Sequence, residues 1–335
     1  MRTPNTQRST ITRRKFLETT TAVAAFAIIP LRYKYINNKQ TNISNFGGVQ
    51  IGTISYSYRT MPAYGPEELL KYCIDSGIGS LEARWIEIEE YAGIPEGPQR
   101  RPLPQNFRGT EQDQRAFEAA QDEAREAQRK WRISVPMTKF EELRHMYNDA
   151  GVILHLAKMR PSNWSDEEID YSFRVAKALG SVGVGEEIGK EACRRMAPFA
   201  EKHNLYAYFH NHGQVGTPGF EFDHYLDISP SIMLNFDVGH WYGATGIHPN
   251  EVLKKYHDRI VSVHLKDKTG PGSTPPDTNM PWGQGETPLA DVLRLIQEEG
   301  WPIYCDIESE YPIPEGSNAV KEIKKCVDYC RQVLL

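Results

Sequence analysis

The sequence has few of the features that mark membrane, disulfide-stabilised or nucleic-acid-binding proteins. None of its apolar runs is long enough for a transmembrane helix. Its five cysteines are scattered and odd in number, which excludes a disulfide framework, and no two of them have zinc-finger spacing. The formal net charge of −5 comes without the clustered Lys and Arg that neutralise phosphates, so nucleic acid is not an expected partner. What remains, with 39% hydrophobic and 25% charged residues, is the composition of a globular protein.

The first 45 residues have the layout of a signal peptide and linker. Arg13 and Arg14 are followed by a short apolar segment and then by the polar stretch NNKQTNISN. This order is typical of a twin-arginine export signal, although a basic tail without structure is the alternative. We therefore expect a periplasmic or otherwise exported protein that keeps no stable membrane insertion after export. Residues 46–335 are expected to form a single domain.

From residue 48 onwards, strand-like runs alternate with helical runs or long loops. The eight strand-like runs are residues 48–59, 79–85, 151–159, 181–188, 205–213, 231–240, 259–267 and 301–311. Alternation of this kind predicts a parallel sheet, and eight units favour a closed (β/α)8 TIM barrel of the α/β class. An open doubly wound sheet is the second choice. It usually has a glycine-rich phosphate turn after its first strand, and GTISYSYR has none.

Local patterns predict where helices and loops begin. Thr138 with Glu141, and Ser165 with Glu168, have the spacing of a capping box at a helix start. A long polar helix is expected from about residue 110 to residue 130. The stretch 86–109 is rich in Pro, Gly and Arg and is predicted to be a long irregular loop, a kind of segment that is usually functional.

Ionisable or polar residues recur at the C-terminal ends of five consecutive predicted strands. They are Glu186, Glu187, His210, Asn211, His212, Asp237, His240, His264, Lys266, Asp267, Glu308 and Glu310. In a TIM barrel, catalytic groups come from these strand ends, which all face one volume. A lone histidine at a strand end is more often part of a structural hydrogen bond than a ligand, but converging strand ends favour a site.

Three of these residues have the chemistry of metal ligands. Asp237, His264 and Glu308 each end a different strand, and carboxylates with an imidazole suit a borderline divalent ion. Either Glu187 or His212 is predicted to be the fourth ligand. Bare affinity favours Zn or Cu, but a protein that folds before export acquires its metal in the cytoplasm, where a weaker binder can be loaded first. Mn is therefore the expected ion, with Zn, Co or Mg as alternatives.

Four motifs taken in order are more specific than any one of them. The series YFHNHG, NFDVGHWYGATG, VHLKD and DIESEY resembles the xylose-isomerase-like TIM-barrel superfamily of sugar isomerases and epimerases, over residues 48–335. The resemblance implies a divalent metal held by Glu, Asp, His and Glu. Asp237, His264 and Glu308 match the last three of these ligands. The first glutamate falls at Tyr208 here, so Glu187 or His212 is expected in its place.

The chemistry that such a site supports is proton abstraction next to a carbonyl. A bound metal polarises the carbonyl oxygen and stabilises the enediolate. Glu308 or Glu187 is expected to act as the base, and His240 to face the substrate. Lys266 is expected to stabilise oxyanion charge, with a surface lysine paired to Asp267 as the alternative. The residues expected to bind substrate are His210, Asn211, Trp241, Trp282 and Glu310.

These expectations describe a metal-dependent sugar isomerase or epimerase. An exported enzyme is expected to act on an unphosphorylated sugar or keto-sugar, because phosphorylated sugars are held in the cytoplasm. A lyase or dehydratase acting on 3-keto-glycosides begins with the same proton abstraction and is the closest alternative. An endonuclease IV-type nuclease would need several metals and a basic DNA-binding face, and a non-enzymatic carbohydrate-binding barrel would not need the metal ligands. Assembly into a homo-oligomer is left open.

Overall fold

The computed structural model describes residues 43–97 and 110–335. Most of the predicted signal segment, residues 1–42, lies outside the described residues. The described chain begins against the barrel, because Ser44 is buried and its hydroxyl donates a hydrogen bond to the carbonyl of Ile51. The two-residue strand β1 (Asn45–Phe46) then pairs antiparallel with the first barrel strand.

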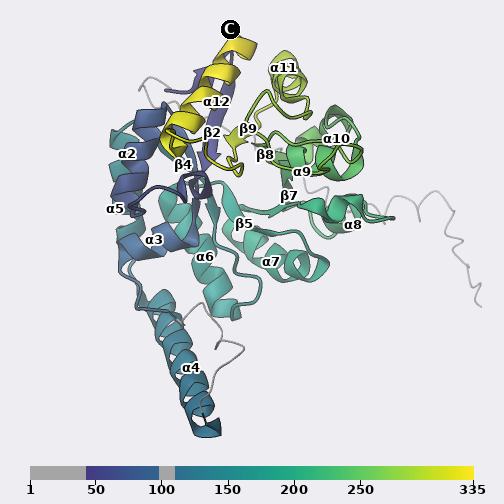
Figure 1. The fold of residues 1–335 in the computed structure, drawn as a ribbon. Coiled ribbons are helices and arrows are strands. Elements are labelled where there is room, and N and C mark those ends of the chain that lie inside the picture. The colour runs from purple at the N-terminus through teal and green to yellow at the C-terminus, as the bar shows by residue number, and fades with distance from the viewer. Residues whose placement is uncertain (1–42, 98–109) are drawn as a thin grey trace, which may run out of the picture. The chain divides into compact units, whose positions relative to one another are not determined.

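Eight parallel strands close into a barrel within the described residues (Figure 1). They follow one another in sequence order, and the last pairs with the first. The strands are β2 (Val49–Ile54), β3 (Ser80–Arg84), β4 (Ile153–Lys158), β5 (Gly183–Glu187), β6 (Tyr206–His210), β7 (Ile232–Asp237), β8 (Ile260–Leu265) and β9 (Tyr304–Ile307). Each lies inside one of the predicted strand-like runs, so the predicted single-domain (β/α)8 TIM barrel is confirmed.

Helices follow the strands and cover the outside of the barrel, as α2, α6, α7, α11 and α12 do in Figure 1. The helices are α2 (Pro66–Ser76), α3 (Trp85–Ala92), α4 (Glu111–Ser134), α5 (Thr138–Asp149), α6 (Asp166–Leu179), α7 (Lys190–His203), α8 (Asp223–Leu226), α9 (Val238–Thr245), α10 (Asn250–Tyr256), α11 (Leu289–Glu299) and α12 (Ala319–Leu334). Helix α11 shows why they pack: its buried residues Leu289, Val292, Leu293 and Ile296 share one face.

Two local predictions are wrong, and both errors have a physical reason. Part of the predicted loop 86–109 is helix α3, which buries Ile88 and ends where Gly93 takes a φ of 83°. Thr138 does not cap a helix, because the backbone of Met137 is already helical and Thr138 lies inside the first turn. The Ser165 capping box does form, and Thr110 forms another with Asp113 at the start of α4.

The barrel interior differs from the large apolar layer between strands and helices. Its apolar part is a small cluster of Leu156, Tyr208, Met233 and Val261. Glycine makes room for the tyrosine, because a Cβ at Gly185 on the neighbouring strand would collide with the Tyr208 ring. The remaining inward positions toward the C-terminal ends of the strands are polar, and they build the site described below.

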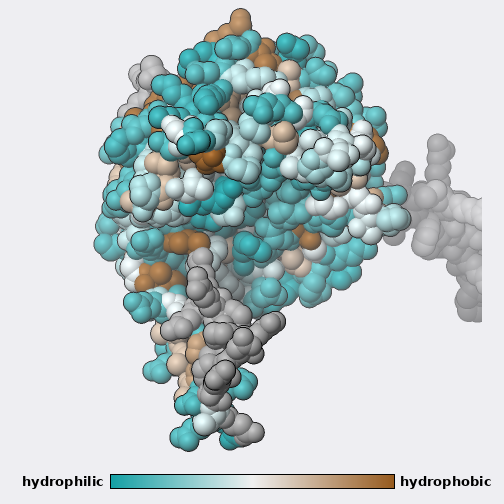
Figure 2. Space-filling view, in the orientation of Figure 1, coloured by the Kyte–Doolittle hydropathy of each residue, from teal (hydrophilic) through white to brown (hydrophobic). Residues whose placement is uncertain are grey.

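No helix in residues 43–97 and 110–335 is both long and apolar enough to cross a bilayer. The face shown in Figure 2 is mostly hydrophilic, with hydrophobic residues scattered over it. Among the described residues, the large hydrophobic side chains that are exposed are few and far apart in sequence: Ile43, Ile74, Ile133, Ile247 and Leu335.

Candidate active site

Strand register brings the predicted site residues to one end of the barrel. In the parallel ladder, Glu187 on β5 pairs with His210 on β6, and Asp237 on β7 pairs with His264 on β8. Glu308 directly follows β9. Side chains alternate along a strand, so residues in the same phase all point into the barrel at this end. The convergence expected from sequence is thus a consequence of closure and register.

Four buried side chains form what we call the inner quartet: His210, Asp237, His264 and Glu308. One ligand atom from each lies within 4.8 Å of the others. Two of their polar atoms, His210 Nε2 and Asp237 Oδ2, are buried without a hydrogen-bond partner. Orphaned buried polar atoms are costly, and here they are two acceptors, of which Asp237 Oδ2 has the Lys266 ammonium 3.3 Å away. The donor set therefore fits a divalent cation.

The fourth member of this set is His210, where the sequence favoured Glu187 or His212. His210 Nδ1 lies 3.1 Å from Asn235 Oδ1, which leaves Nε2 as its free nitrogen. Burial lowers the pKa of His210 well below its ordinary value, and the charges of Lys158 and His264 add to the effect. A neutral imidazole with one free nitrogen is the form that binds a metal.

The two carboxylate oxygens of Asp237, at the end of its strand, make different contacts. One oxygen, Oδ1, accepts a hydrogen bond of 2.6 Å from the backbone N–H of His240 and so caps helix α9. The other oxygen faces the quartet. Asn211 holds the backbone of Asp237 on both sides, by bonds of 3.0 and 3.2 Å. Gly239 completes the motif, because a Cβ there would collide with the backbone of Lys266.

Sequence reasoning missed Glu82, a fully buried carboxylate on β3 that holds His264. Glu82 Oε2 lies 2.5 Å from His264 Nε2, while Glu308 Oε2 lies 3.0 Å from His264 Nδ1. Burial opposes a charged His264 ring, but these two carboxylates outweigh burial and raise the pKa of His264 to about 10. The sequence did contain a signal for Glu82. It lies two residues after Ser80 in the strand SLEAR, so both side chains point to the same, inward face of the barrel.

Lys266 lies at the centre of the negative charges and is not the surface lysine considered as an alternative. Its Nζ lies 2.9 Å from Glu308 Oε2, 3.3 Å from Asp237 Oδ2 and 2.6 Å from Glu310 Oε2. Burial disfavours its charge, but these carboxylates raise the pKa of Lys266 above its ordinary value. Asp267 instead accepts hydrogen bonds from the backbone of Gly283 and Gly285.

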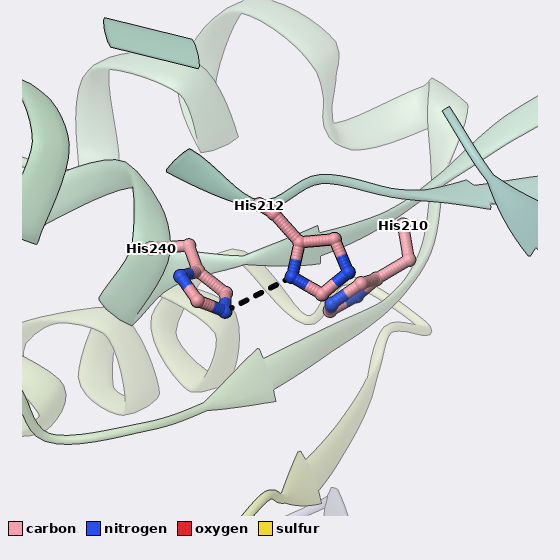
Figure 3. A group of neighbouring side chains, drawn as sticks. All are labelled: His210, His212 and His240. Atoms are coloured by element: carbon pink, nitrogen blue, oxygen red, sulfur yellow. Dashed lines mark hydrogen bonds between the residues drawn. The ribbon is translucent and has the colours of Figure 1, made fainter. Parts of the chain in front are cut away.

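A second group, which we call the outer chain, consists of Glu187, His212 and His240 and starts beside His210 of the quartet. Figure 3 shows its two histidines next to His210. In Figure 3, His212 lies between His210 and His240, and its Nδ1 is 3.2 Å from His240 Nε2. His212 Nε2 lies 2.8 Å from Glu187 Oε2. Burial opposes ionisation of Glu187, but its bond to His212 and the charge of Lys158 lower its pKa to about 2.

His240 has a lysine at each ring nitrogen. Lys266 Nζ lies 3.0 Å from Nε2, and Lys268 Nζ lies 3.3 Å from Nδ1. Burial, and then the charges of these two lysines, lower the pKa of His240 to about 3, so the ring is neutral near pH 7. A neutral imidazole accepts at only one nitrogen, so only one lysine donates at a time.

The remaining predicted substrate-binding residues are placed differently. Glu310 bonds to Lys266 in the site, whereas Asn211 is engaged with the backbone of Asp237. Trp241 packs against Phe222 and Phe236, with ring centres 5.9 and 6.0 Å away. Trp282 lies edge-on to Tyr329 of α12 at 5.5 Å. Glu186, also at a strand end, accepts a bond from the backbone of Ser162.

Comparison with known proteins supports the fold. Residues 181–332 match the family model described as a xylose isomerase-like TIM barrel. An inosose dehydratase from Histophilus somni (strain 129Pt) is 38% identical over 168 residues, which are 43% of this chain and 53% of that protein. The chain thus spans about half the length of this curated relative.

Two solved structures share the fold. A sugar phosphate isomerase/epimerase from Parabacteroides distasonis ATCC 8503 has a TM-score of 0.53 at 14% identity, over 86% of this chain and 96% of that chain. The 3-keto-D-glucoside 4-epimerase from E. coli has a TM-score of 0.54 at 10% identity, over 85% of this chain and 99% of that chain. At these identities the likeness is one of fold alone.

Proposed function

This chain carries a xylose isomerase-like TIM barrel domain, and from that premise we propose that it is a metal-dependent sugar isomerase or epimerase. It acts on an unphosphorylated sugar or keto-sugar by removing the proton next to the carbonyl. The observation that carries the proposal is the inner quartet, whose orphaned atoms His210 Nε2 and Asp237 Oδ2 lie in a buried site beside the Lys266 ammonium.

The four side chains of the inner quartet would hold the metal. When bound, the metal polarises the substrate carbonyl and offsets the negative charge that follows proton removal. Glu82 fixes the His264 ring from behind through Nε2, and Nδ1, which contacts Glu308, would release its proton on binding the metal. Ligand chemistry that lacks thiolates is compatible with Mn, our proposed ion, and with Zn, Co or Mg.

His240 is the base that the charges favour, rather than Glu187 or Glu308 as the sequence suggested. Its low pKa keeps the imidazole unprotonated near pH 7, so the ring can accept a proton once the donating lysine turns away from it. Glu308 belongs to the inner quartet and would be occupied as a ligand, and Glu187 is paired with His212. Behind His240, His212 and Glu187 can accept and pass on the proton through the contacts of the outer chain.

Lys266 is the proposed donor to the oxygen that gains charge. The lysine is buried, and its raised pKa keeps it an ammonium at neutral pH. Its other contacts, with Glu308, Glu310 and Asp237, hold Nζ at the edge of the quartet. A fixed cation in a buried site stabilises developing negative charge more than a solvated one does.

A dehydratase is the second candidate, and the name of the curated relative, inosose dehydratase, favours it. In an elimination, the same base removes the proton next to the carbonyl. The hydroxyl on the next carbon then leaves as water after taking up a proton. The ammonium of Lys266 or the newly protonated His240 would supply that proton, so the atoms balance without any further reactant.

One experiment separates the candidates. Metal-loaded protein is incubated in D₂O with unphosphorylated keto-sugars and 3-keto-glycosides, and NMR follows the products. Deuterium at the carbon next to the carbonyl with a changed configuration indicates an epimerase, a moved carbonyl an isomerase, and loss of water a dehydratase. Asp237→Asn is the matched control. Absence of exchange and of product with every substrate contradicts the proposal.

We also propose that the protein is exported through its paired arginines, Arg13 and Arg14. Replacing both by lysine keeps the charge and removes the twin-arginine pattern. The variant is expected to remain in the cytoplasm, as fractionation and immunoblotting would report. Unchanged export of the lysine variant contradicts this proposal without touching the enzymatic one.

A further inference from the structure

A cavity of about 660 Å³ is lined by residues in a part of the chain outside the family match. It lies at the barrel end that carries the active site, because Trp85 follows β3 and Met159 and Arg160 follow β4. Helix α4 and the loop before α6 supply its other walls. Cavities of this size at this end of a TIM barrel are where ligands bind.

One wall of the cavity is an aromatic ring held rigidly in place. The guanidinium carbon of Arg132 lies 4.0 Å from the centre of the Trp164 ring. Arg132 is itself fixed, since it donates to both oxygens of Glu89, at 2.7 and 3.0 Å, and to Glu168 at 3.1 Å. Such a buried network is an expensive way to gain stability, and its effect here is to fix the Trp164 ring, whose uncovered part lines the cavity.

Arg160 connects this cavity to the outer chain. Its side chain is 54% exposed, and its ion-pair contacts within the described residues are long, 3.7 Å to Glu186 and 3.8 Å to Glu187. Glu187 is the carboxylate that contacts His212. The backbone of Arg160 has a φ of 55°, unusual for a residue other than glycine, and its N–H is bonded to the carbonyl of Gly185. Strained positions of this kind cluster at functional sites.

We propose that this cavity is a second-ring subsite, which binds the non-reacting ring of a glycoside whose keto-sugar ring lies in the active site. The proposal rests on the proposed function. Trp164 offers the apolar face for the ring, and Arg160 and Asn163 offer donors for hydroxyl groups. The other arginines of the cavity, Arg125, Arg129 and Arg132, are paired with acids, so the cavity suits a neutral ring better than a phosphate.

Calorimetry with non-reacting probes tests the subsite without requiring turnover. Methyl β-glucoside carries one ring, and the disaccharide cellobiose carries two. Wild-type protein is expected to bind cellobiose at least about tenfold more tightly, and Trp164→Ala to lose that preference. Trp301→Ala is the matched control, because Trp301 precedes β9 at the opposite end of the strands and stacks on His257 at 4.6 Å.

Trp164→Tyr keeps an aromatic ring for Arg132 and is expected to retain part of the preference for cellobiose. This variant tests the subsite if Trp164→Ala does not fold. Equal affinity of wild-type protein for the two probes overturns the subsite, as does an unchanged preference in Trp164→Ala. The NMR assay on keto-sugars tests the chemistry separately. A ring preference without any turnover would sink the proposed function and leave the subsite standing.

Discussion

The two halves of the barrel contribute different things to the site. The second half, from β5 onward, supplies the inner quartet, the outer chain and Lys266, and the family model matches residues 181–332 within it. The first half supplies support, through Glu82 behind His264 and Lys158 beside Glu187, and it supplies the cavity. The difference teaches that the reacting groups and the space that accepts the substrate can be supplied by separate stretches of one closed sheet.

The largest effect is expected at the residues of the second half that would hold the proposed metal. Asp237→Asn replaces a carboxylate oxygen of the quartet by an amide, so metal content and metal-dependent turnover should fall below detection. Asparagine is also a good helix N-cap, so α9 and the fold should be kept. Elemental analysis, turnover and circular dichroism make the measurement. Wild-type activity in this variant would contradict the assignment of the reacting groups to the second half of the barrel.

The next effect distinguishes the quartet from the outer chain. His210→Gln should weaken metal affinity by more than about 100-fold, beyond the range of outer-shell changes, because it removes a quartet nitrogen. His212→Gln, only two residues away, should leave metal affinity near wild type and lower kcat, because His212 belongs to the outer chain. Competition with a chelating dye measures affinity. The reverse ranking would restore the sequence-based choice of His212 as ligand.

A smaller effect tests the supporting role of the first half. Glu82→Gln removes the charge behind His264 and should lower metal affinity by about 10- to 100-fold, the usual effect of losing a carboxylate partner of a metal-binding histidine. The absorption spectrum of the Co-loaded protein should shift as well. Glu322→Gln is the matched control, because Glu322 is also buried and hydrogen-bonded, to Tyr311, but lies on α12. Equal losses of metal affinity in both variants would mean that Glu82 contributes only to the stability of the fold.

The pH dependence of stability should reflect the neutral ring of the outer chain. The folded protein protonates His240 at about 3, whereas an unfolded chain does so near 6.5. Between these values the unfolded state binds more protons, so stability should fall as pH drops from 6.5 towards 3. His240→Asn should flatten this part of the curve, whereas replacing exposed His248 by Asn should not. Urea unfolding at several pH values is the measurement.

The smallest effect concerns local structure in the first half. Ser165→Ala should cost about 1 kcal/mol, because the Ser165 hydroxyl and the Glu168 carboxylate form a capping box at the start of α6. Thr138→Ala should change stability by less than about 0.5 kcal/mol, because exposed Thr138 caps nothing. Thermal or urea unfolding compares the two. A larger loss at Thr138 would mean that the capping assignment is reversed.

Sequence was a good guide to the barrel and a partial guide to the site. All eight strands were predicted, because alternating strand and helix patterns survive packing. The convergence of Asp237, His264 and Glu308 followed from their positions at strand ends. Sequence did not separate His210 from His212, which share one motif. The two histidines have the same strand phase, and depth separates them: His210 ends β6 and is buried in the quartet, whereas His212 lies beyond the strand with a side chain that is 50% exposed.

The other omissions depended on contacts between distant segments. Glu82 became part of the site only because β3 and β8 face each other across a closed barrel, 182 residues apart in sequence. Trp241 lies beside His240, but the helical turn after Asp237 directs it to Phe222 and Phe236 instead. No spacing rule along the chain reports such placements, because they are set by closure of the sheet and by the direction of helix α9.

Lys266 gives the site a tethered counterion. Its ammonium lies among Asp237, Glu308 and Glu310, so their mutual repulsion is already offset by a group that belongs to the chain itself. Folding therefore does not have to wait for an external cation to neutralise these acids. The order of assembly can be folding first and acquisition of the proposed metal second.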